Sequence, residues 1–207
     1  MKKIVLALFM TLLLPLQACA QEQWTEGEHY LVISDEATET PQINEYFSFW
    51  CPHCFNFEPL VAKIKSKIGQ DVAFQKVHVN FMGFTSTEVQ DDATRAMMVA
   101  RALKKDDAMN QAIFKYIHVQ KSPVTSIKDL KNIFIVNGVE AAEFDKLVSS
   151  FGVNSMLQKN NQLITKYRKH LSGVPNFIVN GKFQAKFTRD MTNDDIVNLI
   201  VWLTKRK

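Results

Sequence analysis

The sequence predicts an α/β fold in which both ends of the chain form one β-sheet domain and an all-helical domain is inserted between them. Three observations lead to this prediction. A strand–helix–strand pattern over 43–80 favours two parallel strands joined by a crossover helix, five consecutive helical patterns follow it, and a strand pair with a final helix closes the chain. We place the sheet domain at 21–83 and 161–207 and the helical insertion at 84–160.

The first twenty residues, 1–20, are typical of a secretory signal peptide. A charged start precedes an apolar segment, Ile4–Leu14, that is too short to span a bilayer, and Ala18-Cys19-Ala20 then has the small-residue pattern of a cleavage site. Cleavage after Ala20 would leave an exported protein that begins at Gln21. No later stretch is long and apolar enough for a membrane helix, so we expect a soluble product.

Cys19 allows a second interpretation of the same segment. Leu16-Gln17-Ala18-Cys19 is similar to a bacterial lipoprotein processing site, in which Cys19 would be acylated and would anchor the protein. Gln17 is an unusual residue in that pattern, so plain secretion is the favoured prediction.

The first half of the predicted sheet domain alternates strands with a helix. His29–Ile33 and Ile43–Trp50 have strand character and are joined by a polar connection. The helix that follows has four apolar residues on one face and ends at Gly69, and Val72–Asn80 is again strand-like.

The middle of the chain is helical. Five helices are predicted, over 93–103, 109–118, 127–136, 141–151 and 156–171. Gly138 and Gly152 fall where helix ends are expected.

The end of the chain returns to strands. Asn176–Val179 is predicted as a strand, Asn180-Gly181 as a tight hairpin turn and Lys182–Phe187 as the paired strand. An amphipathic helix over 196–203 closes the chain and completes the predicted sheet domain.

Composition and charge point away from nucleic acid as a partner. The 207 residues carry a formal net charge of +4, and the charges are interspersed along the chain. Of the three cysteines, cleavage would remove Cys19 and leave Cys51 and Cys54, too few for a disulfide scaffold. A lone Cys-x-x-Cys pair closes so short a loop that a chemical role is favoured over a structural one.

The motif Cys51-Pro52-His53-Cys54 is the strongest functional signal in the chain. It lies between a strand and a helix, which is typical of a thioredoxin-type redox site. At the helix start Cys51 would face unpaired backbone N–H groups, Pro52 suits the first turn, and a protonated His53 would add positive charge. These features favour a Cys51 thiolate, the species that attacks disulfides, with the more buried Cys54 as the resolving thiol.

The acidity of Cys51 determines the direction of this chemistry. Each unit by which its pKa falls below the ambient pH stabilises the reduced form by about 1.4 kcal/mol. For a two-electron couple this raises the reduction potential by about 30 mV, so an acidic Cys51 makes the disulfide a good oxidant.

A zinc site is the competing interpretation of two cysteines at this spacing. Zinc needs four ligands, or three and a water, whereas the chain has no second cysteine pair and its other histidines are scattered singly. We therefore predict no metal and no cofactor other than the redox-active disulfide. His29, His118 and His170 are interpreted as partly exposed side chains without a functional role.

The segment Gly173-Val174-Pro175 precedes the strand that starts at Asn176. Pro175 is either an ordinary strand-entry residue or, as a thioredoxin-like fold would imply, a cis-proline that packs beside the redox pair, with its loop presenting backbone groups to an extended peptide. Composition alone does not distinguish these alternatives, and the Cys-x-x-Cys motif favours the cis-proline.

Glu45 and Lys76 are charged residues on otherwise apolar strand faces. Period-two alternation places each of them among apolar neighbours, which predicts a buried or half-buried ion pair. The pair is either structural or passes protons to and from Cys54. Glu58, in the helix after the motif, is either solvated or tunes the local field.

Together these segments resemble the DsbA family of periplasmic thiol:disulfide oxidoreductases. They fall in the family's order and spacing and cover essentially the whole mature chain. The resembling segments are Glu45-Tyr46-Phe47-Ser48-Phe49-Trp50-Cys51-Pro52-His53-Cys54 with Phe57-Glu58, His78-Val79-Asn80-Phe81-Met82-Gly83, Gly173-Val174-Pro175 and Val179-Asn180-Gly181-Lys182. Trp50 stands where the family often has phenylalanine, and the helical insertion matches least.

The resemblance implies a thioredoxin-like fold with an inserted all-helical domain, located in the periplasm. Carried over by position, Cys51 is the nucleophile, His53 its stabiliser and Cys54 the resolving thiol. The implied partners are newly exported, unfolded polypeptides and a quinone-linked membrane protein of the DsbB type that reoxidises the pair.

The resemblance also implies roles for residues outside the motif. Pro175 would be the cis-proline, and Val174 would contact the backbone of the substrate. Glu45, Glu58 and Lys76 match charged positions near the family's active site.

The predicted function is that of a dithiol oxidase, which donates its Cys51–Cys54 disulfide through a mixed disulfide with the client. Two alternatives remain: a disulfide reductase or isomerase held reduced by another partner, and a non-enzymatic, peptide-binding export chaperone. Isomerases of this kind usually carry an additional dimerisation domain, for which no sequence is left. We expect a monomer.

Overall fold

The strands of the protein come from both ends of the chain, in a computed structural model that describes residues 23–207. They are β1 (Tyr30–Val32), β2 (Gln42–Phe47), β3 (Ala73–His78), β4 (Asn176–Val179) and β5 (Phe183–Ala185). They form one sheet in the order β1-β5-β4-β2-β3, in which β2 and β3 are parallel and the other pairs are antiparallel. The predicted α/β architecture, with parallel pairing around the first helix, is confirmed.

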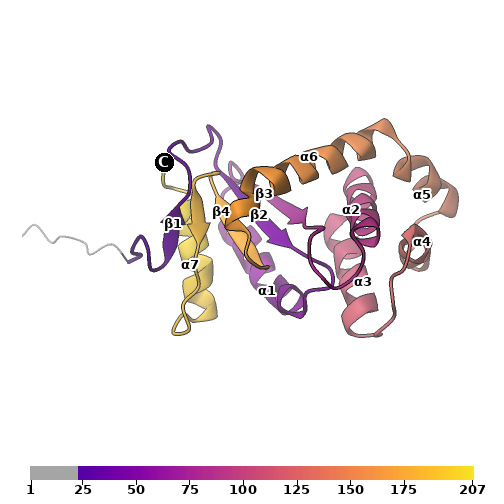
Figure 1. Ribbon diagram of the computed structural model, residues 1–207, viewed down its shortest axis with the longest axis horizontal. Helices are drawn as coiled ribbons and strands as arrows, with labels where there is room; N and C mark the ends of the chain where they lie inside the picture. The colour runs from indigo at the N-terminus through magenta and orange to yellow at the C-terminus, as the bar shows by residue number, and fades with distance from the viewer. Residues whose placement is uncertain (1–22) are drawn as a thin grey trace, which may run out of the picture.

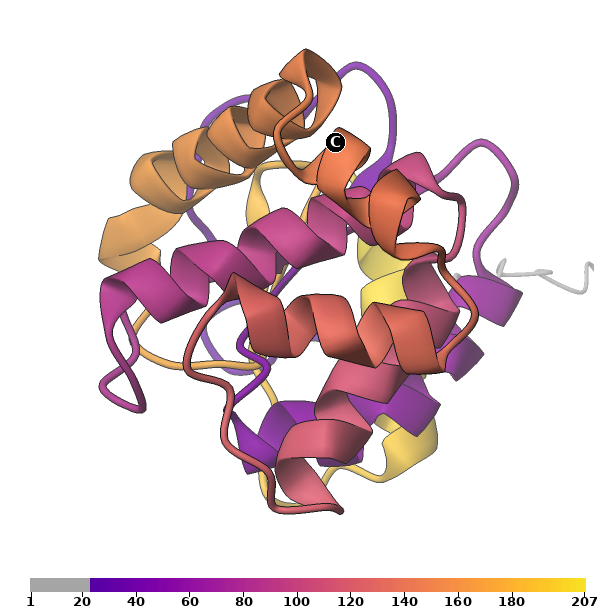
Figure 2. The same ribbon diagram turned by 90° about the vertical axis from the view of Figure 1, so that its right-hand side faces the viewer.

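Seven α-helices accompany this sheet within the described residues. α1 (Pro52–Lys67) connects β2 to β3, and α7 (Asn193–Leu203) follows β5. Five more stand between β3 and β4 in the chain and form the part at the right of Figure 1, which faces the viewer in Figure 2. They are α2 (Thr87–Ala102), α3 (Asp106–His118), α4 (Ile127–Val136), α5 (Ala141–Val148) and α6 (Phe151–Tyr167). The predicted boundary between 160 and 161 lies within α6, so the division into domains stays a prediction.

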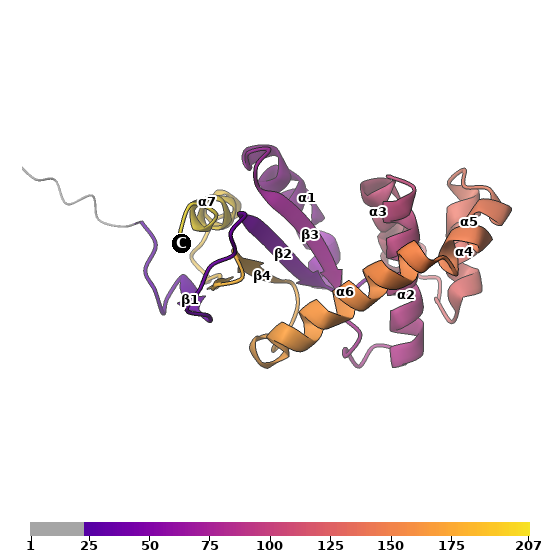
Figure 3. The same cartoon turned by 90° about the horizontal axis from the view of Figure 1, so that it is seen from above.

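Helices cover both faces of the sheet because alternate residues of β2 point in opposite directions. Ile43 packs in an apolar cluster with α1 and α7, whereas Tyr46 packs with residues of α6. Figure 3 shows α1 and α7 on one side of the sheet and α6 on the other. This interior strand is therefore buried on both faces, and its charged residue Glu45 is buried with it.

A third apolar cluster joins the end of β2 to the inserted helices. Phe47, Phe49 and both cysteines of the Cys-x-x-Cys motif belong to it, together with residues of α2, α3 and α4. The redox motif therefore lies where the sheet meets the helical insertion, and helices that are distant in the sequence shape its surroundings.

The break between α5 and α6 differs from the prediction. The helix expected over 141–151 ends at Val148, and Gly152 lies in the first turn of α6 instead of at a helix end. The Ser150 side chain caps α6 by accepting a hydrogen bond from the N–H of Val153 at 3.2 Å. A serine N-cap therefore separates the two helices, because its oxygen satisfies an N–H group that has no partner within the helix.

The predicted hairpin turn connects β4 and β5. Asn180 and Gly181 both have positive φ, 52° and 66°, as a type I′ turn requires. The Asn180 side chain also accepts a hydrogen bond from the N–H of Gln42 at 3.0 Å and donates to three backbone carbonyls at and after the end of α7. The turn therefore attaches the hairpin to β2 and to the C-terminal segment.

None of the helices within residues 23–207 combines the length and the apolar character that crossing a membrane requires. The predicted signal peptide and Cys19 lie outside the described residues, so secretion and acylation both stay predictions.

Candidate active site

Cys51 occupies the N-cap position of α1, directly after the turn that ends β2. Its backbone is extended, with φ −86° and ψ 113°, and its N–H donates to the carbonyl of Ser48 at 3.1 Å. Pro52 begins the helix, where its missing N–H costs nothing. The Cys51 sulfur accepts a hydrogen bond from the N–H of Cys54 at 3.2 Å, so sulfur takes the role that a serine or aspartate oxygen has at other helix starts.

This position makes Cys51 acidic. Its pKa falls to about 6, chiefly because the Cys54 thiol hydrogen-bonds to the sulfur; burial opposes the fall, and the N–H groups of Cys54 and His53 and the charge of His53 add to it. Backbone N–H groups and the helix dipole stabilise an anion at a helix N-terminus. At neutral pH Cys51 is therefore mainly a thiolate, although only 3% of the residue is exposed.

The pKa of Cys54 is shifted in the opposite direction to that of Cys51. Burial raises the pKa of its thiol, and the hydrogen bond to Cys51 and the charge of the Cys51 thiolate raise it further. Both cysteines are free, so the structure represents the dithiol form of the pair. The favoured state at neutral pH is one thiolate and one thiol, which differs from the disulfide by two electrons and one proton.

Pro52 and His53 are exposed on the first turn of α1. The charge of His53 contributes less to the low pKa of Cys51 than do the Cys54 thiol and the backbone N–H groups. The sequence points to the helix start and to His53 as causes of the acidity, but it does not indicate the leading cause. That cause is the thiol of Cys54, which the helical turn brings within reach of the Cys51 sulfur.

The loop before β4 lies beside the Cys51 sulfur. The Val174–Pro175 peptide bond is cis, the second of the two alternatives that the sequence left open. In its protonated form the Cys51 thiol donates to the carbonyl oxygen of Val174 at 3.4 Å. The structure therefore brings the predicted substrate-contacting residue next to the predicted nucleophile.

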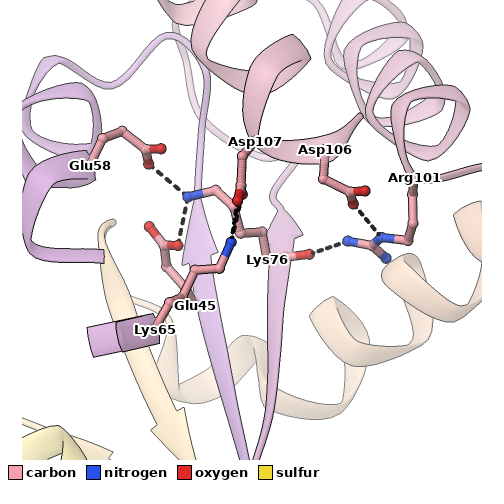
Figure 4. Close-up of polar contacts among 7 residues, drawn as sticks. All are labelled: Glu45, Glu58, Lys65, Lys76, Arg101, Asp106 and Asp107. Carbon is pink, nitrogen blue, oxygen red and sulfur yellow. Dashed lines mark hydrogen bonds and ion pairs between the residues drawn. The ribbon is translucent and has the colours of Figure 1, made fainter. Parts of the chain in front are cut away.

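Glu45 and Lys76 stand opposite each other on the paired strands β2 and β3. The Lys76 ammonium lies between two carboxylates, at 2.7 Å from Glu45 and 2.7 Å from Glu58 of α1 (Figure 4). The side chain of Glu45 is fully buried, that of Lys76 is 8% exposed and that of Glu58 is 26% exposed. The predicted buried ion pair is present, and Glu58 is part of it instead of being simply solvated.

Burial and charge act against each other in this network. Burial raises the pKa of Glu45, while the charge of Lys76 lowers it, and the net shift is upward. Burial lowers the pKa of Lys76, but the charges of Glu45 and Glu58 raise it more. Among the described residues, the Oε1 atom of Glu45 has no hydrogen-bond partner. Glu45 is thus a buried carboxyl group with increased proton affinity, and its charge raises the pKa of Cys54.

Further polar contacts connect this network to the inserted helices (Figure 4). Lys65 of α1 binds both carboxylate oxygens of Asp107 at 2.6 Å. Arg101 of α2 donates to the backbone carbonyl of Lys76 at 3.3 Å and also pairs with Asp106. The region beside the redox helix is therefore bonded to α2 and α3 as well as to the sheet.

His78, at the end of β3, is buried and neutral. Its Nδ1 lies 2.8 Å from the hydroxyl of Thr94, and that hydroxyl donates its proton to the carbonyl of Gln90, so Nδ1 is the donor to Thr94. Burial lowers the pKa of His78 to about 3. The residue therefore packs as an uncharged ring beneath the motif, with Phe49 and Trp50 against it.

The sequence assigns no role to His118, and the structure places it against the motif. Its Nε2 lies 2.8 Å from the carbonyl oxygen of Phe49, a residue 69 positions away in the chain. Its ring stacks on Phe55, with centroids 5.2 Å apart and planes 8° apart. No local sequence signal marks this contact, because it depends on how α3 packs against α1.

The arrangement is suited to thiol–disulfide exchange. An acidic cysteine at a helix start attacks readily and also leaves readily, and a buried second thiol nearby resolves mixed disulfides. Within residues 23–207, no three His, Cys, Asp or Glu side chains are grouped in a way that would hold a metal ion.

Comparisons with known proteins agree with this chemistry. A family model described as a DSBA-like thioredoxin domain matches residues 42–196. The thiol:disulfide interchange protein DsbA of Haemophilus influenzae is 33% identical over 210 residues, which cover 99% of this chain and 98% of the relative. The protein of the same name from Escherichia coli is 35% identical over 187 residues, 89% of this chain and 86% of the relative.

Solved structures are similar over most of the chain. The crystal structure of the disulfide oxidoreductase DsbA from Proteus mirabilis has a TM-score of 0.76 and 28% identity, covering 88% of this chain and 98% of its own. A cysteine-to-serine variant of that protein, in complex with a non-covalently bound peptide, has a TM-score of 0.74 and 27% identity, covering 88% of this chain and 99% of its own.

Proposed function

Because the chain belongs to the DsbA-like thioredoxin domain family, whose fold it has, we propose that its thiol:disulfide oxidoreductase activity runs in the oxidising direction. The protein donates its Cys51–Cys54 disulfide to newly exported proteins. The observation that carries this proposal is the pKa of about 6 at Cys51. An acidic nucleophile stabilises the dithiol form, which makes the disulfide a strong oxidant and disfavours a role as reductase.

The proposed reaction has two exchange steps. In the first, a client thiolate attacks the Cys51 sulfur, the Cys51–Cys54 bond breaks, and Cys54 leaves with the electron pair and takes up a proton because its pKa is raised. In the second, the other client thiolate attacks the client sulfur of the mixed disulfide, and Cys51 leaves as a stable thiolate. The client loses two electrons and the protein gains them.

Glu45 is the proposed source of the proton that Cys54 takes up. Its raised pKa and its unpartnered Oε1 atom support this role, because burial makes this carboxyl group hold a proton more tightly than an exposed one does. Lys76 and Glu58 adjust that affinity through charge. We propose a functional role for the network in addition to its structural one.

Val174 and Pro175 are proposed as the surface that receives the client. The position of the Val174 carbonyl beside the Cys51 sulfur supports this role, since a client cysteine that reaches that sulfur comes next to this loop. The relative from Proteus mirabilis has been captured with a non-covalently bound peptide, which agrees with peptides as the substrate class.

The partners and the location are also proposals. The clients are unfolded or extended exported polypeptides, and a quinone-linked membrane protein of the DsbB type takes the electrons from the reduced pair. The protein acts as a monomer in the periplasm after cleavage near Ala20. Anchoring through an acylated Cys19 is the alternative, and the intact mass of the mature protein distinguishes the two.

Two matched cysteine variants test the proposed reaction. Cys51→Ser removes the nucleophile, so we expect it to abolish oxidation of a reduced model protein. Cys54→Ser keeps the nucleophile but removes the resolving thiol. When it is mixed with a model protein that already carries a disulfide, the Cys51 thiolate should attack that bond and release the other client sulfur as a thiolate. The resulting mixed disulfide should accumulate and be visible on non-reducing gels. Oxidation that persists in Cys51→Ser would contradict the assignment, and rescue of client folding by this variant would favour a chaperone.

The direction of the reaction has its own test. The purified protein is equilibrated in glutathione buffers, and the fluorescence of Trp50, next to the pair, reports the fraction reduced. A potential well above that of the glutathione couple is expected for a disulfide donor. A low, thioredoxin-like potential would make the protein a reductase or isomerase.

A further inference from the structure

We propose that His118 is a positioning residue for the redox pair: from the inserted helices it fixes the backbone segment before Cys51 in the geometry that stabilises the thiolate. This inference rests on the proposed function, because it concerns the acidity of the same cysteine. It assigns to the helical insertion a part in setting the chemistry of the motif.

The hydrogen bond between His118 and Phe49 defines the proton position on the histidine ring. Nε2 lies 2.8 Å from the Phe49 carbonyl oxygen, and a carbonyl only accepts, so Nε2 must carry a proton. The contact exists in both the neutral ring with a proton on Nε2 and the charged ring. It therefore persists whatever the charge of the histidine.

His118 contacts the chain on both sides of the motif. Phe49 lies two residues before Cys51, and Phe55, on which the His118 ring stacks, directly follows Cys54. The histidine is the last residue of α3 and is partly buried at this point. One side chain from the insertion thus bridges the turn that leads into α1 and the first turn of α1 itself.

The Cys51 thiolate depends on the geometry that this bridge maintains. The Cys51 N–H bonds to the Ser48 carbonyl at 3.1 Å, and the Cys51 sulfur accepts the Cys54 N–H at 3.2 Å. The first bond closes a turn that contains the Phe49–Trp50 peptide, so it depends on the orientation of the Phe49 carbonyl. The second bond depends on how that turn delivers Cys51 to the helix start. If the carbonyl is released, the N-cap gains conformational freedom, the N–H groups align less well with the sulfur, and the thiolate loses part of its advantage over the thiol.

Two substitutions separate the hydrogen bond from the ring. His118→Phe keeps a flat ring for stacking on Phe55 but cannot donate to Phe49. His118→Gln removes the ring but carries an amide N–H that reaches about as far from Cα as Nε2 does. The measurements are the thiolate absorbance of Cys51 against pH and the equilibrium of the pair with glutathione.

We expect His118→Phe to raise the pKa of Cys51 and to shift the glutathione equilibrium toward the disulfide by at least about twofold. One net hydrogen bond changes an equilibrium constant by roughly fivefold, and only part of that effect should reach the Cys51 sulfur. His118→Gln should shift the pKa of Cys51 and the glutathione equilibrium less than His118→Phe does. A shift of less than about twofold in His118→Phe, or equal shifts in both variants, would overturn the proposal. If His118→Phe does not fold, His118→Leu provides the same loss of the donor.

The control is His29→Phe, at the opposite end of the sheet from β3, which should leave both readouts unchanged. Circular dichroism and thermal unfolding confirm that each variant is folded. The wild-type potential by itself tests the proposed function, whereas the difference between variants and wild type tests the role of His118. The two inferences can therefore fail separately.

Discussion

Cys51 and Cys54 are the same residue type within one helical turn, and their surroundings shift their pKa values in opposite directions. Cys51 accepts hydrogen bonds from the Cys54 thiol and from N–H groups at the helix start, so its pKa falls to about 6. Burial raises the pKa of Cys54, and the hydrogen bond to Cys51 and the charge of the Cys51 thiolate raise it further. These opposite shifts support the proposed order of attack, in which Cys51 reacts and Cys54 resolves.

This asymmetry predicts how the reduction potential depends on pH. Above about pH 6 reduction of the disulfide takes up one proton, so the potential should fall by about 30 mV per pH unit; below it, with Cys51 protonated as well, the slope should double to about 59 mV. Potentials measured in redox buffers between pH 4 and 8, at steps of about one pH unit, locate the pH at which the slope changes. A single slope across this interval would contradict an acidic Cys51.

The same shift has a consequence for stability. Because the pKa of Cys51 is lowered in the folded dithiol form, the stabilisation is complete above the usual pKa of a thiol and is lost as the pH falls through about 6. The free energy of unfolding of the reduced protein, relative to the oxidised protein, should therefore decrease by about 1.4 kcal/mol from pH 7 to pH 5. Urea unfolding of both redox forms at the two pH values measures this difference.

Lys76 compensates two carboxylates in a buried environment. Lys76→Met should destabilise the protein by about 3–5 kcal/mol, because it leaves the buried Glu45 carboxylate without its partner. Lys65→Met removes an exposed ion pair with Asp107 and should cost no more than about 1 kcal/mol. Urea unfolding compares them, and adding Glu45→Gln to Lys76→Met should recover part of the loss; equal costs in the two lysine variants would contradict this account.

At the scale of elements, the turn between β4 and β5 is a position where glycine is required for two reasons. Gly181 has φ of 66°, and a Cβ atom there would lie 3.0 Å from the Tyr167 hydroxyl oxygen and 3.1 Å from a methyl carbon of Thr38. Gly138, after α4, has φ of 79°, but a Cβ atom there would have no neighbour within 4 Å. A side chain at Gly138 would meet only backbone strain, whereas one at Gly181 would meet backbone strain and a steric conflict.

Alanine substitutions at these glycines should have different costs. Gly138→Ala should destabilise by about 1 kcal/mol through its positive φ alone. Gly181→Ala should lose at least about 1 kcal/mol more, because the neighbouring side chains must also move. Thermal unfolding of the two variants tests the difference, and equal losses would show that the neighbours of Gly181 yield without cost.

At the scale of the whole molecule, the helical insertion is attached to the edge strand β3. The Asn160 side chain of α6 accepts a hydrogen bond from the N–H of His78 at 3.1 Å and donates to the His78 carbonyl at 2.9 Å. It thereby pairs backbone groups that an edge strand would leave without a strand partner. Lys65 and Asp107 form a further link, between α1 and α3.

Loss of the Asn160 contacts should therefore affect the entire fold. Asn160→Leu keeps the size of the side chain but leaves a buried N–H and a buried C=O unpaired, so we expect a loss of about 2–5 kcal/mol in the free energy of unfolding. Gln158→Leu, at an exposed position of the same helix, should change it by no more than about 0.5 kcal/mol. Guanidinium unfolding measures the free energy of unfolding of both variants. Similar losses in the two would show that the Asn160 contacts do not stabilise the fold.

Much of the fold and the site follows from local signals. Strand alternation, the Asn-Gly pair and the Cys-x-x-Cys spacing each act over a few residues. For this reason the strands, the hairpin turn and the position of the cysteine pair between a strand and a helix were predictable. The break between α5 and α6 was not, because Ser150 and Gly152 are competing end signals two residues apart and only the packing of the helices selects one.

The sequence by itself determined the α/β class, the position of the Cys51–Cys54 pair at a helix start and the pairing of Glu45 with Lys76, since these depend on periodicity, spacing and strand register. Only the tertiary structure decided that Glu58 joins this pair, that Val174 lies beside Cys51 and that His118 contacts the motif from 69 positions away. The physical reason is that hydrogen bonds and desolvation depend on which groups the fold brings within a few ångströms, whatever their separation along the chain.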